Sequence, residues 1–417
     1  MFQKKILKNG LRLVEVPMQG VDTVTSLVIF GVGSRHENKK NNGISHLIEH
    51  LAFKGTKKRP TPFLIAKELD SIGADFNAFT GEEYTGYWVK SRAAHLKESL
   101  EIFSDMILNS LMRQKNIDEE KKVIVEEIRM MHDTPIRYAD MIIENLLFQG
   151  NALGYFIAGS EASVRGISKD DITAFCQEYY RPQNVVVVVA GKIPKEVESL
   201  TTKNFSFFNR SGGAKKPEKF VNKNKKRILI DSRKTKQSHL RLASLGLSLD
   251  DEDQYVYEVL GTILGGSMSS RLFEEIREKR SLAYYINAHA DSYTDIGSFV
   301  VRAGVNTARL EESIKVIVAE LRKSTRNIKD EEVSRAKEIL KGAMALEKED
   351  SYELAWLFGH QELLQKETLN YEQIIKKIDS VEKSDIKRIA QKIFGRGFYL
   401  ALVGQGNEEK LLKLIGD

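Results

Sequence analysis

The feature that most constrains the fold is an internal repeat. A helical pattern begins at Leu96–Leu100, and a similar one begins at Leu310–Ile314. A repeat of this length means that each copy folds as a structural unit. The sequence therefore predicts two homologous halves of about 200 residues each. The other matching pairs, again about 210–214 residues apart, are 164–172 with 378–386, 185–190 with 398–403, and 76–78 with 286–288.

A polar, basic stretch separates the two halves. Residues 209–217 combine glycine, proline and lysine, and Lys223, Lys225, Lys226 and Arg227 follow. This composition is typical of an exposed linker. The predicted division is a first domain at 1–208, the linker at 209–227 and a second domain at 228–417. Nucleic-acid binding is the weaker interpretation, because the net charge of +6 comes from 64 basic and 58 acidic residues spread along the chain.

Strand and helix signals appear in each half. Residues 23–30 and 185–189 are β-branched, apolar runs of strand length. A helix with one buried face is predicted where apolar residues recur at three-and-four spacing. Because helices follow the strands in each half, we expect an α+β architecture. That helical stripe consists of Leu96, Leu100, Phe103, Ile107 and Leu111.

Composition excludes several other classes of protein. With 417 residues, 41% hydrophobic and 29% charged, the chain resembles ordinary globular domains and not a disordered or fibrous protein. No apolar run approaches the length of a membrane span, so we expect no membrane partner. The first ten residues lack a signal-peptide pattern. Cys176 is the single cysteine, which we expect to be a buried core residue in a cytoplasmic protein.

The segment that indicates chemistry is His46-x-x-Glu49-His50. On a helix, His46 and His50 lie about 40° apart, so their ring nitrogens can point at one ion. The alternative interpretation is two surface histidines and a solvated glutamate on an amphipathic helix. The apolar residues on the opposite side of this helix are Ile44, Leu47, Ile48 and Leu51.

A catalytic zinc needs a third protein ligand, and a second helix offers one. Projected around this helix, Glu127 and Glu120 fall inside its apolar stripe, whereas Glu126 points away. A carboxylate facing a core is costly unless its charge is compensated, and a metal can do that. Glu127 is therefore the better ligand, while Glu120 is either a residue that orients a ligand or part of a buried salt bridge. The predicted stripe consists of Val123, Ile124, Ile128 and Met131.

The segments 46–56, 73–80 and 120–128, in this order along the chain, resemble the motifs of the pitrilysin family. This is a family of inverted-motif zinc peptidases that includes insulin-degrading enzyme and mitochondrial processing peptidase. The resemblance extends over essentially the whole chain and is closest to the half-length bacterial processing-protease-like members. It implies that His46, His50 and Glu127 bind one Zn²⁺ per chain and that Glu49 is the catalytic base. The ligand types alone suit several ions. The motifs are 46–50 followed by Phe53-Lys54-Gly55-Thr56, then Gly73-Ala74-x-x-Asn77-Ala78-x-Thr80, then Glu120 to Ile128.

The resemblance also implies how a peptide is held. Family members add an extended peptide to a strand edge beside the zinc, and Phe76, Asn77 and Ala78 match that edge. Arg277 and Tyr284 match an arginine and a tyrosine that contact the substrate backbone. Without the resemblance, these two would be interpreted as a helix-surface charge and an ordinary strand aromatic. The implied fold is one bowl of a clam-like peptidase, so we expect a homodimer, or else a heterodimer with an inactive homologous chain.

The second half lacks the metal motif. In the repeat alignment, Val256, Val259 and Leu260 stand near the positions of the two histidines and the base, and Glu338 stands at the position of Glu127. This half is therefore expected to be catalytically silent. A phosphate-binding role for Gly265-Gly266 is rejected because the signal is weak.

The sequence thus predicts a zinc-dependent endopeptidase that hydrolyses short or unfolded peptides in an enclosed chamber. The mechanism is attack by a metal-activated water, with a glutamate as general base. The alternative is a non-catalytic core-like or partner subunit of a larger peptidase or respiratory complex. Such subunits lack metal-site residues, whereas this chain carries all four of them.

Overall fold

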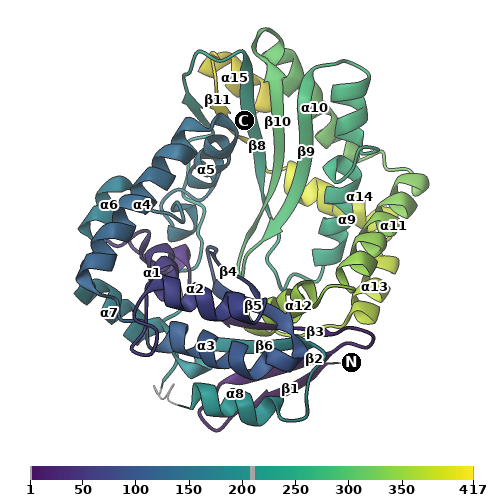
Figure 1. The fold of residues 1–417 in the computed structure, drawn as a ribbon. Helices are drawn as coiled ribbons and strands as arrows, with labels where there is room; N and C mark the ends of the chain where they lie inside the picture. The colour runs from purple at the N-terminus through teal and green to yellow at the C-terminus, as the bar shows by residue number, and fades with distance from the viewer. Residues whose placement is uncertain (1, 207–211, 417) are drawn as a thin grey trace. The chain divides into compact units, whose positions relative to one another are not determined.

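The computed structural model describes residues 2–206 and 212–416 and divides the chain into two compact units (Figure 1). Unit 1 comprises 1–129, 155–218 and 346–370, and unit 2 comprises 130–154, 219–345 and 371–417. Each unit is described here by itself. The first three residues of the predicted linker, 209–211, lie outside the described residues.

Unit 1 is built on a six-stranded sheet in the order β1-β2-β6-β3-β5-β4. Its strands are β1 Gln3–Ile6, β2 Arg12–Pro17, β3 Thr23–Phe30, β4 Asp75–Thr80, β5 Thr85–Arg92 and β6 Val185–Gly191. Its helices are α1 Ile44–Ala52, α2 Pro62–Ser71, α3 Leu96–Leu108, most of α4 Gln114–Asp133, α6 Glu161–Gly166, α7 Lys169–Tyr179, α8 Val197–Phe205 and α12 Ser351–Leu364.

Unit 2 is built on a five-stranded sheet in the order β7-β11-β8-β10-β9. Its strands are β7 Ile228–Asp231, β8 Gln237–Gly246, β9 Ala283–Ser292, β10 Gly297–Asn306 and β11 Tyr399–Val403. Its helices are α5 Pro135–Leu147, α9 Gln254–Gly265, the π-helical segment Phe273–Glu278, α10 Leu310–Ser324, most of α11 Asp330–Glu347, α13 Tyr371–Asp379, α14 Lys383–Phe394 and α15 Glu408–Ile415.

The two sheets share one topology. In unit 1, β6 runs parallel to β2 and antiparallel to β3, while β5 pairs antiparallel with both β3 and β4. In unit 2, β11, β8, β10 and β9 repeat these relations, with β7 in the place of β2. The α+β architecture predicted from the sequence is confirmed. The predicted runs at 23–30 and 185–189 form β3 and β6, and Leu111 alone of the helical stripe lies beyond the end of α3.

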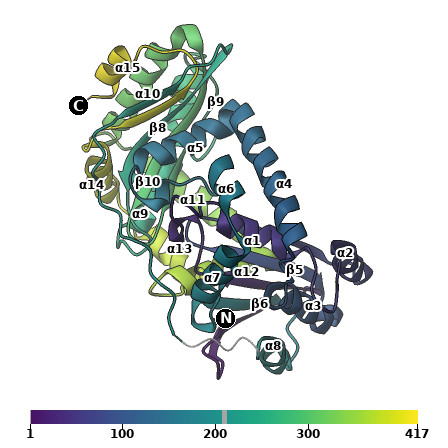
Figure 2. The same cartoon turned by 90° about the vertical axis from the view of Figure 1, so that its left-hand side faces the viewer.

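Each half of the chain contributes one helix to the unit of the other half. Helix α12, from the second half, packs on β3 and β6 of unit 1 (Figure 1). A Cβ atom on its Gly359 would lie 3.0 Å from Val188, so glycine permits this close approach. Helix α5, from the first half, packs on β8 and β11 of unit 2 (Figure 2). The compact units therefore depart from the predicted division at 208 and 228.

Burial explains this exchange. The inner face of α5 carries Ala139, Ile142 and Leu146, which are buried against residues such as Ala243 and Ala401 of the sheet in unit 2. A helix packs where its apolar stripe finds an apolar surface, whichever half of the chain encodes it.

The described helices include none that combines the length and the apolar composition needed to cross a membrane. Cys176 packs against the core of unit 1 but is partly exposed, because α7 lies at the surface, so the prediction of a buried cysteine was wrong in degree.

Candidate metal centre

Helix α1 presents the predicted motif on one side and a core on the other. Its four apolar residues, 44, 47, 48 and 51, are buried, whereas the side chains of His46 and His50 are 15% and 18% exposed. The two imidazole rings lie 4.6 Å apart between centroids. The four-residue spacing of the histidines therefore places both rings at the same partly open surface.

The amino end of α1 is held by Glu37, a residue that sequence reasoning missed. The helix begins after Gly43, which has a φ of 96° and no side chain that could cap the helix. The buried Glu37 carboxylate replaces the cap, since it accepts hydrogen bonds from the backbone N–H groups of Gly43 and Ser45, each at 2.8 Å. A glutamate seven residues before the first residue of a helix is not a usual capping signal, so the sequence offered no indication of this role.

Helix α4 places Glu127 opposite the two histidines. Its Oε2 atom lies 3.9 Å from Nε2 of His46 and 3.9 Å from Nε2 of His50. Glu126 points to solvent, where its side chain is 70% exposed and pairs with Arg129. The choice of Glu127 over Glu126 as the inward carboxylate is thus consistent with the structure.

The prediction that Val123 belongs to the buried stripe of α4 was wrong. Val123 is 44% exposed, and Val125 is buried in its place. The two valines lie on opposite sides of buried Ile124, and the core covers the side of Val125. Glu127 projects on the less covered side, which is why its side chain remains 31% exposed.

The donor set fits a zinc ion. One ligand atom from each of His46, His50 and Glu127 lies within 4.8 Å of the others. The 3.9 Å separations exceed hydrogen-bond length, so these groups do not bond to one another. Ligands at zinc-bond length in a tetrahedron are about 3.4 Å apart, so a small inward shift would complete the site. Two imidazoles, one carboxylate and an open position are typical of catalytic zinc.

Glu120 orients His50. Its Oε2 atom lies 3.0 Å from Nδ1 of His50, and its Oε1 atom pairs with Lys54 at 2.8 Å. Burial would raise the pKa of Glu120, but the hydrogen bonds from His50 and Lys54 outweigh it and lower that pKa. With Nδ1 donating to Glu120, Nε2 of His50 keeps its lone pair toward Glu127. Both alternatives raised for Glu120 therefore apply, since it contacts a candidate ligand and forms a buried ion pair.

The substitution Glu120→Gln is expected to weaken zinc binding by about 10–100-fold, because the neutral amide accepts a weaker hydrogen bond from His50 and no longer balances the charge of Lys54. Zinc affinity measured by competition with a chromophoric chelator checks this. Glu119→Gln is the matched control, since Glu119 is exposed one residue away on α4. Equal zinc affinities for the two variants would contradict the orienting role.

Burial sets the protonation of the remaining groups. It lowers the pKa of His46 to about 4, and the neighbouring His50 adds to this effect. The imidazole is therefore neutral, the form that binds metal, at physiological pH. Burial also raises the pKa of Glu49, although a hydrogen bond from Thr80 opposes the shift. A carboxylate with a raised pKa is suited to accept a proton near neutral pH.

Thr80 at the end of β4 donates its hydroxyl hydrogen bond to Oε2 of Glu49. The sequence motif that contains Thr80 was recognised, but no role was assigned to this side chain. The contact joins the predicted base to strand β4, which is paired only on its β5 side in the described sheet. The segment Phe76, Asn77 and Ala78 belongs to this edge strand, as predicted from the resemblance.

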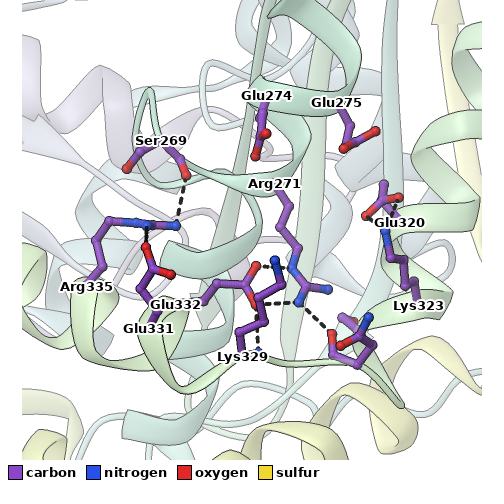
Figure 3. A network of polar contacts seen from close by, with 12 residues as sticks. Ser269, Arg271, Glu274, Glu275, Glu320, Lys323, Lys329, Glu331, Glu332 and Arg335 are labelled. Carbon is purple, nitrogen blue, oxygen red and sulfur yellow. Dashed lines mark hydrogen bonds and ion pairs between the residues drawn. The ribbon is translucent and has the colours of Figure 1, made fainter. Parts of the chain in front are cut away.

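Arg277 and Tyr284 belong to unit 2. Arg277 lies on the π-helical segment, with its guanidinium 4.8 Å from the ring centre of Phe273. Tyr284 is the second residue of β9 and is 56% exposed. Arg271, two residues before this segment, binds the Glu332 carboxylate through two nitrogens (Figure 3) and also donates to the carbonyl of Asn327.

The helix equivalent to α1 in unit 2 is α9, and apolar residues stand at the positions aligned with the two histidines and Glu49. Val256, Val259 and Leu260 are buried in the core. Glu338 on α11 forms an ion pair with Lys341 at 2.6 Å. In the part of the chain that the structure describes, the single group of potential metal ligands found is the one at His46, His50 and Glu127.

The fold and this group of residues are typical of inverted-motif zinc peptidases. The family model described as Insulinase (Peptidase family M16) matches residues 14–161, and that described as Peptidase M16 inactive domain matches 166–340. The chain is 33% identical over 409 residues to the uncharacterized zinc protease YmxG of Bacillus subtilis, covering 97% of this chain and 98% of YmxG. It belongs to peptidase family M16.

Solved structures agree with this family. A protease from Helicobacter pylori superposes with a TM-score of 0.92 at 26% identity, covering 97% of this chain and 99% of that one. A chain of complex III2 from Candida albicans has a TM-score of 0.83 at 18% identity, covering 99% of both, and shares the fold alone. The second matched family model carries the word inactive in its description, in keeping with the missing motif in the second half.

Proposed function

We propose that the chain is a zinc-dependent endopeptidase acting on short or unfolded peptides. The observation that carries the proposal is the convergence of His46, His50 and Glu127, with Glu49 on the same helix as the two histidines. The side chains that a metal-assisted hydrolysis would use all belong to unit 1. The zinc-protease names of relatives support the same activity.

The mechanism assigns one role to each side chain. Zn²⁺ held by the three ligands would polarise the scissile carbonyl and lower the pKa of a water molecule. Glu49 accepts the proton from the attacking water and delivers it to the leaving amine. Thr80 fixes the Glu49 carboxylate through its hydroxyl group. The open edge of β4 binds the peptide through backbone hydrogen bonds, which tolerate many side chains.

Digestion of an unstructured peptide of about 20–30 residues, followed by mass spectrometry, tests the activity. Cleavage is expected with the zinc-loaded protein, loss of cleavage with a chelator, and recovery after zinc is added back. No cleavage by folded, zinc-loaded protein would contradict the proposal and favour a non-catalytic subunit.

We further propose that the active form is a homodimer in which Arg277 and Tyr284 of one chain serve the zinc of the other. Mixing Glu49→Gln chains with Arg277→Ala chains is then expected to restore about a quarter of the wild-type activity, since half of the dimers are mixed and each holds one complete site. Activity of the mixture equal to that of the separate variants, in dimers verified as mixed, would show that each chain works alone.

A further inference from the structure

A basic pocket lies at the carboxyl ends of two helices of unit 2. Helix α10 ends at Ser324 and α14 at Phe394, and the two helices pack against each other (Figure 1). The pocket has a volume of about 490 Å³, and pockets of about 300–1,000 Å³ are typical of small-molecule sites. The lining residues that bear on its chemistry are Arg322, Lys323, Arg326, Gln391, Gly395 and Gly397.

Positive charge in the basic pocket is only partly balanced. Three cations line the pocket, and none of its lining residues is acidic. Lys323 forms an ion pair with Glu320 at 3.2 Å. Within the described ranges 2–206 and 212–416, neither Arg322 nor Arg326 forms an ion pair. Like charges that line one pocket repel each other, so a bound anion would lower the free energy of the group.

Two further arginines lie next to the basic pocket. Arg396 stands in the chain between Gly395 and Gly397, which both line the pocket. Arg227 donates to the carbonyl oxygens of Arg396 and Phe398, each at 3.4 Å. In the part of the chain that the structure describes, neither of these arginines has an acidic partner. The unbalanced positive charge therefore continues from the pocket to the segment that precedes β7.

Helix ends account for part of this charge. A cation in the last turn of a helix balances the partial negative charge of the helix end. Arg322 and Lys323 occupy the last turn of α10 and have that position. Arg326 and Arg396 follow the last residues of α10 and α14, and Arg227 precedes β7. Helix ends therefore explain two of these five cations, and the other three need another reason to gather here.

The backbone and one aromatic ring shape the basic pocket. The guanidinium of Arg322 lies 6.0 Å from the ring centre of Phe398, so a ring supports it in place of a carboxylate. A Cβ atom on Gly395 would lie 2.6 Å from the carbonyl oxygen of Gln391. Gly397 has a φ of 80°, which favours glycine. The loop between α14 and β11 thus presents backbone to the pocket at these two positions.

We propose that the basic pocket binds a ligand with two or three adjacent phosphate groups, held by Arg322, Arg326 and the cations beside them. Guanidinium groups match phosphate oxygens with two parallel N–H donors. One phosphate group carries at most about two negative charges, fewer than the cations gathered here. An inorganic triphosphate and the phosphate chain of a nucleotide share this chemistry. The site is separate from the proposed peptidase activity, because no lining residue belongs to the metal centre or to β4.

Isothermal titration calorimetry of the whole chain with inorganic triphosphate, inorganic phosphate, ATP and adenosine tests the site. Triphosphate is expected to bind about tenfold more tightly than inorganic phosphate, and adenosine is expected not to bind. ATP binding as tight as that of triphosphate would assign recognition to the phosphates alone, whereas tighter binding of ATP would identify a nucleotide as the ligand. Equal affinities for triphosphate and inorganic phosphate would overturn the proposal. Binding of a single-stranded oligonucleotide without binding of triphosphate would also overturn it.

Substitutions assign the binding to the basic pocket. Arg326→Ala is expected to weaken triphosphate binding about tenfold, because charge-assisted hydrogen bonds are lost. Arg326 is exposed beyond the end of α10, so the variant is expected to fold. Arg326→Lys restores the charge without the paired donors and is expected to recover part of the affinity.

The matched control is Arg335→Ala on α11. This arginine also belongs to unit 2, its side chain is 41% exposed, and it forms an ion pair with Glu331 at 3.4 Å. Its loss changes the net charge of the chain by the same amount, so the wild-type affinity for triphosphate is expected. An equal loss of affinity in Arg326→Ala and Arg335→Ala would show a response to net charge alone and overturn the proposal.

Triphosphate can also chelate zinc, so the titration is made on zinc-loaded and on zinc-free protein. Equal affinities are expected, because the pocket contains no group of the metal centre. Binding confined to the zinc-loaded protein would place triphosphate on the metal and overturn the basic pocket. Failure of the peptide digestion would contradict the peptidase activity and leave the expected triphosphate affinity unchanged, so the two proposals fail separately.

Discussion

Replacing Glu49 by glutamine is expected to lower peptide hydrolysis by about 10²–10⁴-fold while leaving bound zinc in place. Glutamine keeps the size of the side chain and can still accept the hydrogen bond from Thr80. It cannot take a proton from water, so the general-base step is lost. Initial rates on the peptide substrate and zinc content by atomic absorption, measured on the same preparations, check both halves of the expectation.

The matched control for this substitution is Glu98→Gln on the exposed first turn of α3, which is expected to retain full activity. The hydrolysis rate of Thr80→Val is expected to lie between those of Glu49→Gln and Glu98→Gln. This variant loses the hydrogen bond to the Glu49 carboxylate but keeps the base itself. A Glu49→Gln protein with most of its activity would show that another group accepts the proton. Loss of zinc in that variant would show instead that Glu49 contributes to metal binding.

The parts of the site that could be predicted from the sequence are those encoded within one helix. His46, Glu49 and His50 lie within five consecutive residues of α1, so their relative directions follow from helix geometry alone. The inward direction of Glu127 also followed from projection around α4. The exposure of Val123 did not, because projection gives directions but not which side of the helix the core covers.

Contacts between distant segments required the structure. Thr80 reaches Glu49 only because β4 ends beside α1, and Glu37 caps α1 from a turn outside it. The sequence likewise did not predict that α5 packs in unit 2 and α12 in unit 1. Each helix is amphipathic or apolar, but its own residues do not indicate which of the two similar sheets it packs on.

The repeat, by contrast, predicted two homologous α+β halves, and the structure has two sheets of one topology. Duplicated strands such as β3 and β8 pair with equivalent neighbours in each unit. The absence of the metal motif from the second half could be read from the sequence as well. Buried Val256 and Leu260 can pack in a core but cannot bind a metal. The two halves therefore share one sheet topology, whereas the metal motif lies in the first half.

Replacing Glu127 by glutamine is expected to lower zinc affinity by on the order of a hundredfold or more, because the only negatively charged ligand of the group is removed. Both imidazoles remain, so weak binding persists and activity returns in part at high zinc. The measurement is zinc affinity by chelator competition, together with the rise in melting temperature on adding zinc, which is expected to shrink in the variant.

Glu126→Gln separates this loss from a general effect of changing α4. Its side chain is 70% exposed and forms an ion pair with Arg129, so zinc affinity is expected to remain at the wild-type value. The comparison with Glu49→Gln is equally informative, since that variant should keep metal and lose hydrolysis. If Glu127→Gln retained zinc as tightly as Glu126→Gln, a third ligand other than Glu127 would have to complete the site, and the inward carboxylate would serve only to balance the charge around His50.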